Sequence, residues 1–233
     1  MRGKAALKGK IAYGYTDKLY RNDNGSFTDV TDLAGVKNYS YSLSATTFDF
    51  NRDGWTDIYV ACDYDEPDFL YINNGDGSFT NVADKALKHM SNFSMGVDIA
   101  DINNDGFLDV YVADMVAEDN FRQKTNMSGM NPKRFYALAE AGYHYQYMFN
   151  ALHLNNGDSS FSEVAQLSGI SNTDWSWTPL FIDFDQDGYK DLIVTNGLIK
   201  EMRNKDFEIW RKDFFKKKME EAEKTGNKQL YVN

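Results

Sequence analysis

The sequence of 233 residues has a single cysteine, three histidines and no long apolar run. Because Cys62 has no second cysteine to pair with, an internal disulfide and a thiolate metal cluster are excluded, and we expect a small apolar residue inside a strand. No stretch is long enough to cross a bilayer, so no transmembrane segment is predicted. The N-terminal segment is basic but has no apolar h-region, so we expect no signal peptide in this chain.

The composition also argues against disorder, because 42% of the residues are hydrophobic and 15% are aromatic. The length allows one large all-β unit or two small domains, and either could bury a substantial core.

A nine-residue acidic loop occurs three times, beginning at Asp49, Asp101 and Asp183, and each copy reads D-x-[DN]-x-D-G-x-x-D. Oxygen side chains at positions 1, 3, 5 and 9, a carbonyl at position 7 and a glycine at position 6 suit a hard cation that takes six to eight oxygens. Calcium fits this description better than magnesium. The sequence therefore predicts about three calcium ions, with the following ligand residues: Asp49, Asn51, Asp53, Trp55, Asp57, Asp101, Asn103, Asp105, Phe107, Asp109, Asp183, Asp185, Asp187, Tyr189 and Asp191.

The predicted calcium sites also explain the formal net charge of −10. Three bound calcium ions would bring it to about −4, so the acidity indicates metal sites and nucleic-acid binding is not expected. Two carboxylates about 5 Å apart repel by about 3 kcal/mol at an effective dielectric of 20, so we expect the loops to be loose without metal. The alternative is that they are ordinary solvated turns, which also favour Asp, Asn and Gly.

The loops are not EF-hands, since position 12, where an EF-hand has a bidentate Glu, is Val60, Val112 and Val194. The ninth-position Asp instead opens a run rich in β-branched and aromatic residues, such as Asp57-Ile-Tyr-Val-Ala. Similar runs lead into each loop, so each loop is predicted to join the two strands of a β-hairpin.

A second phrase, Leu-Tyr/His-x-Asn followed by a Gly-containing turn and Ser-Phe-x-x-Val, alternates with the first. Phe27 and Phe79 are 52 residues apart, and so are Asp49 and Asp101. A repeat of about 50 residues holding four strands is typical of a propeller blade. We expect the acidic loop to join strands A and B, and the second phrase to form strands C and D.

The predicted fold is all-β: a partial β-propeller of about three four-stranded blades with calcium-binding hairpin loops, a helical insertion and a C-terminal helix. Residues 42–82 form blade one, residues 94–164 form blade two, and residues from 176 supply strands A and B of blade three. Residues 18–30 supply only C and D of an earlier blade. Because a closed ring uses four to eight blades, we interpret the chain as a piece of a longer protein with open edges.

The blades are expected within residues 1–200, with the insertion at about 114–148, and residues 201–233 are expected to form an amphipathic helix linking to a missing blade. In the insertion, Asn131 can cap a helix that starts at Pro132 and ends at Gly142. The aromatic residues 143–147 could stack on a sugar, although we favour their packing the insertion onto its own blade. The C-terminal helix is predicted over residues 204–224, with Gly226 ending it.

The two phrases resemble the FG-GAP/VCBS repeats of integrin-α-like propellers over roughly residues 15–210. The segments 94–101, 118–125, 131–132, 142–147 and 172–177 are most similar to VCBS proteins of the cartilage-acidic-protein type, which often end in an ASPIC/UnbV domain and occur in exported bacterial proteins. The resemblance implies a seven-bladed propeller, calcium in the A–B hairpins at Asp49, Asn51, Asp53, Asp57 and their counterparts, and an extracytoplasmic location.

Two functions remain open on the sequence. The first is a non-enzymatic scaffold, in which calcium stiffens the hairpins so that a surface can bind a protein or a glycan. The second is a calcium-dependent carbohydrate-active enzyme, a lyase or hydrolase, which needs a paired acid and base. His89, His144 and His153 stand alone, and His144 between two tyrosines is the best catalytic candidate. We favour the scaffold and predict no catalytic residue; the sequence indicates neither the ligand nor the oligomeric state.

Overall fold

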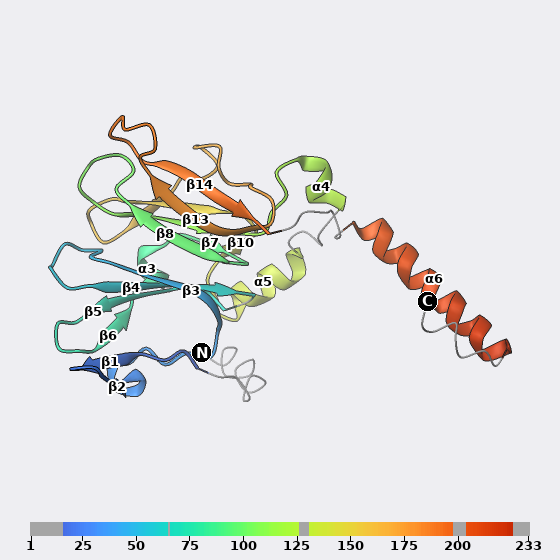
Figure 1. Ribbon diagram of the computed structural model, residues 1–233, viewed down its shortest axis with the longest axis horizontal. Helices are drawn as coiled ribbons and strands as arrows, with labels where there is room; N and C mark the ends of the chain where they lie inside the picture. The colour runs from blue at the N-terminus through green and yellow to red at the C-terminus, as the bar shows by residue number, and fades with distance from the viewer. Residues whose placement is uncertain (1–15, 65, 126–130, 198–203, 226–233) are drawn as a thin grey trace. The chain divides into compact units, whose positions relative to one another are not determined.

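The computed structural model describes residues 16–64, 66–125, 131–197 and 204–225 (Figure 1). The chain divides into two compact units, one that holds the β-sheets and one that holds helices α4 (Asn120–Thr125) and α6 (Lys205–Thr225). Each unit is described by itself. No helix among these residues is long and apolar enough to cross a membrane.

Two four-stranded antiparallel sheets form the centre of the first unit. They match the predicted complete blades one and two, and in each the strands follow one another in chain order, with neighbouring strands hydrogen-bonded. Blade one consists of β3 (Tyr41–Phe48), β4 (Asp57–Asp63), β5 (Phe69–Asn73) and β6 (Phe79–Asn81). Blade two consists of β8 (Gly96–Ala100), β9 (Asp109–Ala113), β11 (Ala151–Asn155) and β12 (Phe161–Glu163).

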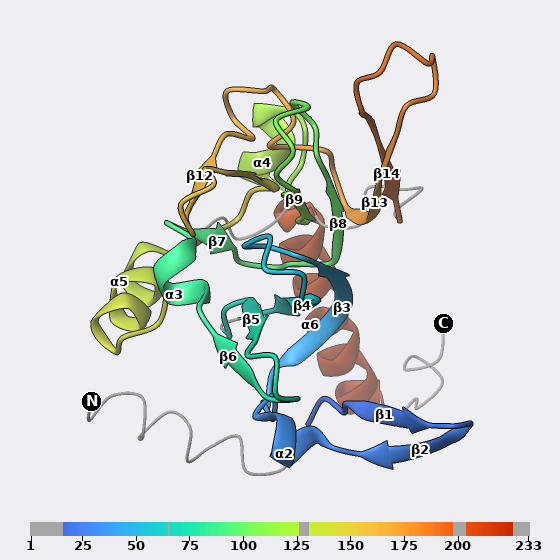
Figure 2. The same cartoon turned by 90° about the vertical axis from the view of Figure 1, so that its left-hand side faces the viewer.

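Two further sheets have two strands each and are half-blades. β1 (Tyr20–Asp23) and β2 (Ser26–Asp29) supply strands C and D, and β13 (Ser176–Ile182) and β14 (Asp191–Asn196) supply strands A and B. Figure 2 shows these two hairpins at opposite ends of the unit, with the complete blades between them. The predicted all-β sets of strands are confirmed as two four-stranded sheets and two hairpins, and the described sheets do not close a ring.

The core lies between successive blades, because each of the two four-stranded sheets buries residues on both faces. Phe48, Tyr59 and Leu70 of blade one meet Val110 and Phe161 of blade two in the largest apolar cluster. A second cluster joins the β1–β2 half-blade to blade one, and a third joins blade two to the β13–β14 half-blade. Burying each of these large side chains stabilises the fold by about 1.5–3 kcal/mol, so neighbouring blades hold one another together.

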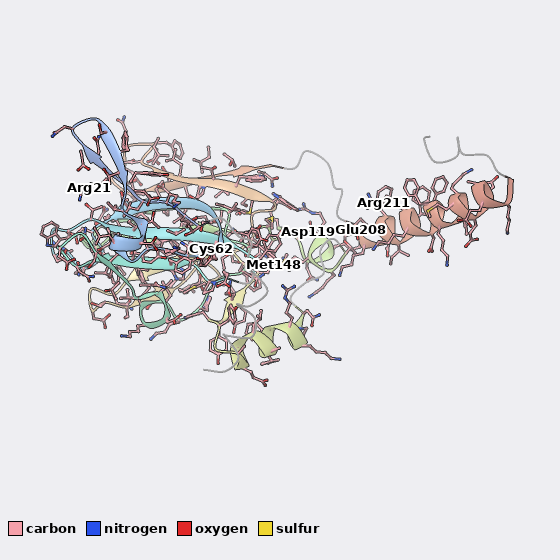
Figure 3. All side chains as sticks on the ribbon, turned by 90° about the horizontal axis from the view of Figure 1, so that it is seen from below. Arg21, Cys62, Asp119, Met148, Glu208 and Arg211 are labelled. Carbon is pink, nitrogen blue, oxygen red and sulfur yellow. The ribbon has the colours of Figure 1, made fainter. Side chains whose placement is uncertain are left out.

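Cys62 lies in β4 and is fully buried, as the sequence predicts. Its thiol is 3.6 Å from the Ser42 hydroxyl, and burial raises the pKa of the thiol above its usual value. Figure 3 shows Cys62 among the side chains of the sheets. The residue therefore packs as a small apolar group.

Two single-turn helices were not predicted: α2 (Thr31–Ala34) and α3 (Ala83–Ala86), each directly after an outermost strand. A side chain at the end of that strand accepts a hydrogen bond from the first residue of the turn. Asp29 accepts from Thr31 N at 3.0 Å, and Asn81 accepts from Ala83 N at 3.1 Å. Four residues are too few for a helical periodicity to appear in the sequence. The sequence signal for these two turns is the capping side chain, which the sequence analysis did not use.

The insertion contains α5 (Pro132–Glu140), and Asn131 caps it by accepting hydrogen bonds from Lys133 N (3.0 Å) and Arg134 N (3.3 Å). The predicted helix and its cap are confirmed. Phe135 contacts the rings of Tyr145 and Tyr147, with centroids 5.9 and 5.2 Å away. The insertion also pairs β10 (Gln146–Tyr147) in parallel with β7 (Met90–Ser91). The aromatic residues therefore pack the insertion, although Tyr145 keeps half of its surface exposed.

Helix α6 agrees with the predicted C-terminal helix, and Asn204 caps it through hydrogen bonds from Asp206 N and Phe207 N. Phe207, Trp210 and Phe214 stack along one side with centroids 5.7 and 5.2 Å apart. Figure 3 labels Glu208 and Arg211 on the same helix. Gly226 and the boundary near residue 200 lie outside the described residues.

Two buried carboxylates lie at the ends of β4 and β9 that are away from the acidic loops. Asp68 accepts hydrogen bonds from Tyr59 Oη (2.8 Å), Cys62 N (2.8 Å) and Ser94 Oγ (3.0 Å), and Asp114 accepts from Ser91 Oγ (2.5 Å) and three backbone N–H groups. Burial raises the pKa of Asp68 to about 7 and that of Asp114 to about 6. Since one turn donates to both carboxylates, they connect blade one to blade two.

Candidate functional site

The three acidic loops fold in the same way, although positions 4, 7 and 8 carry a different residue in every copy. In each loop the first Asp accepts one hydrogen bond from the N–H of position 5 and one from the glycine N–H of position 6. The distances are 3.1 and 2.9 Å for Asp49, 3.1 and 2.8 Å for Asp101, and 3.1 and 3.1 Å for Asp183. The loop thus curls around its first carboxylate.

Positions 3 and 5 complete the curl. The position-3 side chain accepts from the N–H of position 5 at 3.2 Å, and the position-5 carboxylate accepts from the N–H of position 7 at 2.8 Å, in all three copies. Positions 4 and 6 have left-handed backbone, with φ of 58–63° and 86–93°. Glycine at position 6 has no Cβ to oppose this conformation, so the motif requires it there.

The third loop gathers three carboxylates. Asp183, Asp185 and Asp187 each place an oxygen within 4.8 Å of the others. In the first two loops, an Asn takes the middle place and donates from Nδ2 to the position-5 carboxylate, at 2.8 Å from Asn51 and 2.9 Å from Asn103. Charge repulsion is therefore greatest in the third loop, and all three donor sets consist of the hard oxygens that calcium prefers.

The Asp at position 9 also has a structural role. Asp57 accepts from Phe50 N and Asn73 N, both at 2.8 Å, and Asp109 accepts from Ile102 N (3.0 Å) and Asn155 N (2.9 Å). Both carboxylates are fully buried, and this desolvation raises their pKa values, which the backbone hydrogen bonds partly offset. The sequence predicts these residues as ligands; the structure shows that each also joins its loop to strand C.

Neighbouring loops contact each other through position 4. The Arg52 guanidinium lies 5.0 Å from the centre of the Phe107 ring, and Asn104 Nδ2 donates to Gly188 O at 3.0 Å. The three loops therefore lie in a row at one end of the blades (Figure 1). We call this row the loop end of the protein.

The Asn of strand C is a site residue that the sequence reasoning missed. Asn73 Nδ2 donates to Thr56 O at 3.1 Å, and its Oδ1 accepts from Gly75 N at 2.9 Å. Asn155 makes the same turn contact and donates to Phe50 O of blade one at 3.0 Å. This side chain holds the acidic loop against the C–D turn, and the repeated Leu-x-x-Asn-x-Gly phrase was its signal.

The aromatic residue at position 7 covers the glycine of the C–D turn. A Cβ built on Gly75 would lie 3.0 Å from Trp55 Nε1, and a Cβ on Gly157 would lie 2.8 Å from Phe107 Cζ. Position 7 thus has two roles: its carbonyl is a predicted metal ligand, and its ring packs the loop onto the next hairpin. Tyr189 has no such hairpin among the described residues and is 59% exposed.

The Gly157→Ala substitution should therefore destabilise the protein by about 2–3 kcal/mol, because a Cβ there both strains a left-handed residue and displaces the Phe107 ring. Gly77 is the matched control, since it has a φ of 87° and open space around it. Gly77→Ala should cost only about 1 kcal/mol. Urea unfolding followed by circular dichroism measures both, and equal losses would show that the ring contact contributes nothing.

The three histidines have different hydrogen-bonding environments. His144 Nε2 is 3.0 Å from Leu87 O, and its Nδ1 is 3.2 Å from Tyr145 O. His153 is fully buried with no hydrogen-bond partner among the described residues, and burial lowers its pKa to about 4. His89 Nε2 lies 3.3 Å from Glu163 Oε2. Each ring is thus held in its own structural setting.

The fold and the loop end define a class of protein: a repeat protein whose four-stranded blades make a β-propeller-like scaffold for binding. A family model for FG-GAP-like repeats matches residues 11–60, 49–112 and 137–194, which is more than half of the chain. The protein belongs to the FG-GAP-like repeat family. No curated protein matches the chain.

Proposed function

We propose that this protein is a calcium-binding, extracytoplasmic β-propeller scaffold that binds a protein or glycan without catalysing a reaction. The observation that carries the proposal is the shared hydrogen-bond layout of the three loops, in which the side-chain oxygens at positions 1, 3 and 5 accept the same backbone N–H groups in each copy. In the third loop, the carboxylates at these positions also lie within 4.8 Å of one another. Their sequences differ, so the common feature is the metal-type donor pattern.

The first, third and fifth side chains are at least partly exposed in every loop, so an ion can reach them from solvent. When bound, calcium would supply positive charge that offsets the repulsion between the loop carboxylates. The residues that would hold it are those predicted from the sequence, with the position-7 carbonyl and the position-9 carboxylate completing each set. We further propose that the chain is of the cartilage-acidic-protein type.

A non-enzymatic role is supported by how the chemical groups are used. The clustered carboxylates belong to the loops, and the ring nitrogens of His144 face backbone carbonyls. Beside His144, a shallow hollow of about 320 Å³ lies between Lys85, Lys88, Tyr143 and Tyr145. Aromatic and charged groups in this arrangement suit a glycan or a polar protein surface.

Isothermal titration with calcium tests the metal proposal. We expect three sites per chain, with magnesium binding more weakly at the same concentration. The Asp183→Asn, Asp185→Asn, Asp187→Asn triple variant removes the charges of the third loop without changing its size, so it should bind two ions. Binding that is absent, or that is the same in the triple variant, would refute the proposed calcium sites.

A further inference from the structure

We propose that the hollow beside His144 binds a sugar chain that carries carboxylate or sulfate groups, which rests on the proposed function and narrows its ligand to an anionic glycan. The hollow has a volume of about 320 Å³ and lies in the first unit, between residues 84–88 and residues 142–145 of the insertion. Figure 2 shows α3 and α5 on the same side of this unit. Neither stretch is part of the two-stranded sheets, so the site does not depend on the strands that would complete them.

Two lysines supply the positive charge of the hollow. Lys85 and Lys88 are exposed, and within the described part of the chain neither ammonium group has an ion-pair or hydrogen-bond partner. Asp84 is the one acidic side chain among the residues that line the hollow. Both ammonium groups can therefore donate to the oxygens of a carboxylate or sulfate, and such charge-assisted hydrogen bonds are stronger than those between neutral groups.

His144 holds the two walls of the hollow together. Its Nε2 is 3.0 Å from Leu87 O, directly after α3, and its Nδ1 is 3.2 Å from Tyr145 O in the insertion. Both partners are carbonyl oxygens, which only accept hydrogen bonds. When both ring nitrogens carry a proton, the ring donates to both carbonyls and adds a positive charge to the hollow. The spacing between the lysines and the insertion is therefore set before a ligand binds.

Two tyrosines on the insertion side provide aromatic surface for a sugar ring. Tyr145 is 52% exposed, and Phe135 of α5 packs against it with ring centroids 5.9 Å apart. The Tyr143 hydroxyl donates to Glu66 Oε1 at 3.5 Å, which ties this ring to the connection between β4 and β5. Rings that are already held in place lose little conformational freedom on binding, and each combines an apolar face with a polar edge.

An anionic glycan fits these groups better than an acidic peptide does. Extended peptides commonly bind by adding a strand to a sheet edge. The hollow is lined by a single-turn helix and by loop residues, and none of its lining residues lies in a strand. A sugar ring carries its charged group beside a flat apolar face, which matches an exposed tyrosine next to two lysines. The hollow therefore suits a charged sugar.

Isothermal titration in EDTA tests the ligand class with three β-1,4-linked glucose chains of equal length, which differ only in a hydroxyl, carboxylate or sulfate at C6. We expect a charged form to bind about tenfold more tightly than the neutral form, and the tighter of the two identifies the anionic group. Oligoglutamate of equal charge should bind no better than the neutral sugar. Equal binding of neutral and charged sugars, or oligoglutamate binding as tight as that of the charged sugars, would overturn the proposal.

The Lys85→Gln, Lys88→Gln double variant should bind the charged sugar about tenfold more weakly, with an unchanged melting temperature because both side chains are exposed and unpaired within the described residues. The matched control is Lys212→Gln, Lys216→Gln, which removes the same charge from exposed positions of α6 in the other unit. It should bind as the unmodified chain does. Equal losses in the two variants would show a general charge effect and would refute the site.

Tyr145→Leu tests the aromatic surface separately. Leucine keeps an apolar side chain beside Phe135 but removes the ring, so binding of the charged sugar should weaken by about fivefold. An unchanged affinity would show that no sugar ring stacks on Tyr145 and would contradict the assignment of a glycan.

These titrations are independent of the proposed calcium sites, because no acidic-loop residue lines the hollow and EDTA removes the ion. An absence of calcium binding would refute the metal sites and would leave the sugar measurement intact. If all three sugars fail to bind, the anionic-glycan proposal is overturned while the calcium titration keeps its meaning.

Discussion

Replacing Asp109 with alanine is expected to lower the free energy of unfolding by about 3–5 kcal/mol, because one buried and one partly buried N–H group lose their charged acceptor. These groups are Ile102 N and Asn155 N, at 3.0 and 2.9 Å from the carboxylate. The substitution separates the acidic loop of blade two from strand C of the same blade. In a protein of this size, the melting temperature should fall by about 6–20 °C.

Asp191→Ala is the matched control. Asp191 occupies the same position of the third loop, but it is only partly buried and accepts one described hydrogen bond, at 3.2 Å. Its loss should cost about 1 kcal/mol or less. Both variants are unfolded with urea in EDTA, so that a lost metal ligand cannot contribute. Similar losses in the two variants would show that the buried anchor is not the source of the effect.

Calcium is expected to raise the melting temperature by about 10 °C over the same protein in EDTA. If the contributions of the three sites are simply added, each at a free calcium concentration ten times its Kd, they stabilise the folded state by about 4 kcal/mol in total. For a chain of this length, each kcal/mol of stabilisation raises the melting temperature by about 2–4 °C, so about 4 kcal/mol corresponds to a shift of about 10 °C. Differential scanning calorimetry with added calcium, magnesium or EDTA measures it.

The variant that neutralises Asp183, Asp185 and Asp187 supplies the control for this experiment. In EDTA it should melt slightly above the unmodified chain, because three mutually repelling carboxylates have been replaced. In calcium its stabilisation should be about two thirds as large. A calcium shift that is absent from the unmodified chain, or that is undiminished in the variant, would contradict the assignment of the loops.

The strands could be predicted because the two phrases recur at a fixed spacing, and each predicted hairpin is present with its loop at the expected residues. The loop ligands could be grouped for the same reason, since the backbone of a D-x-[DN]-x-D-G loop is set by its glycine and its first Asp. Asn131 and Pro132 likewise predict the start of α5, because an Asn cap and a Pro at the first helical position are local signals in the sequence.

The remaining features depend on contacts between residues far apart in the sequence. Nothing local to Asp57 or Asp109 distinguishes a metal ligand from a buried anchor, because the second N–H comes from a strand that follows much later. The contact of Arg52 with Phe107 joins two repeats, and the pairing of β7 with β10 spans the insertion. The sequence of a single repeat does not contain the information that predicts contacts between successive repeats.

In the first and second acidic loops the fourth residue contacts the following loop, so these contacts run in one direction along the chain. Arg52 touches the aromatic ring of the second loop, and Asn104 binds a backbone carbonyl of the third. An ion that stiffens the first loop would thereby restrict the motion of the second, and the second would restrict the third. Successive ions would then bind with growing ease, and the saturation curve would be steeper than that of isolated sites.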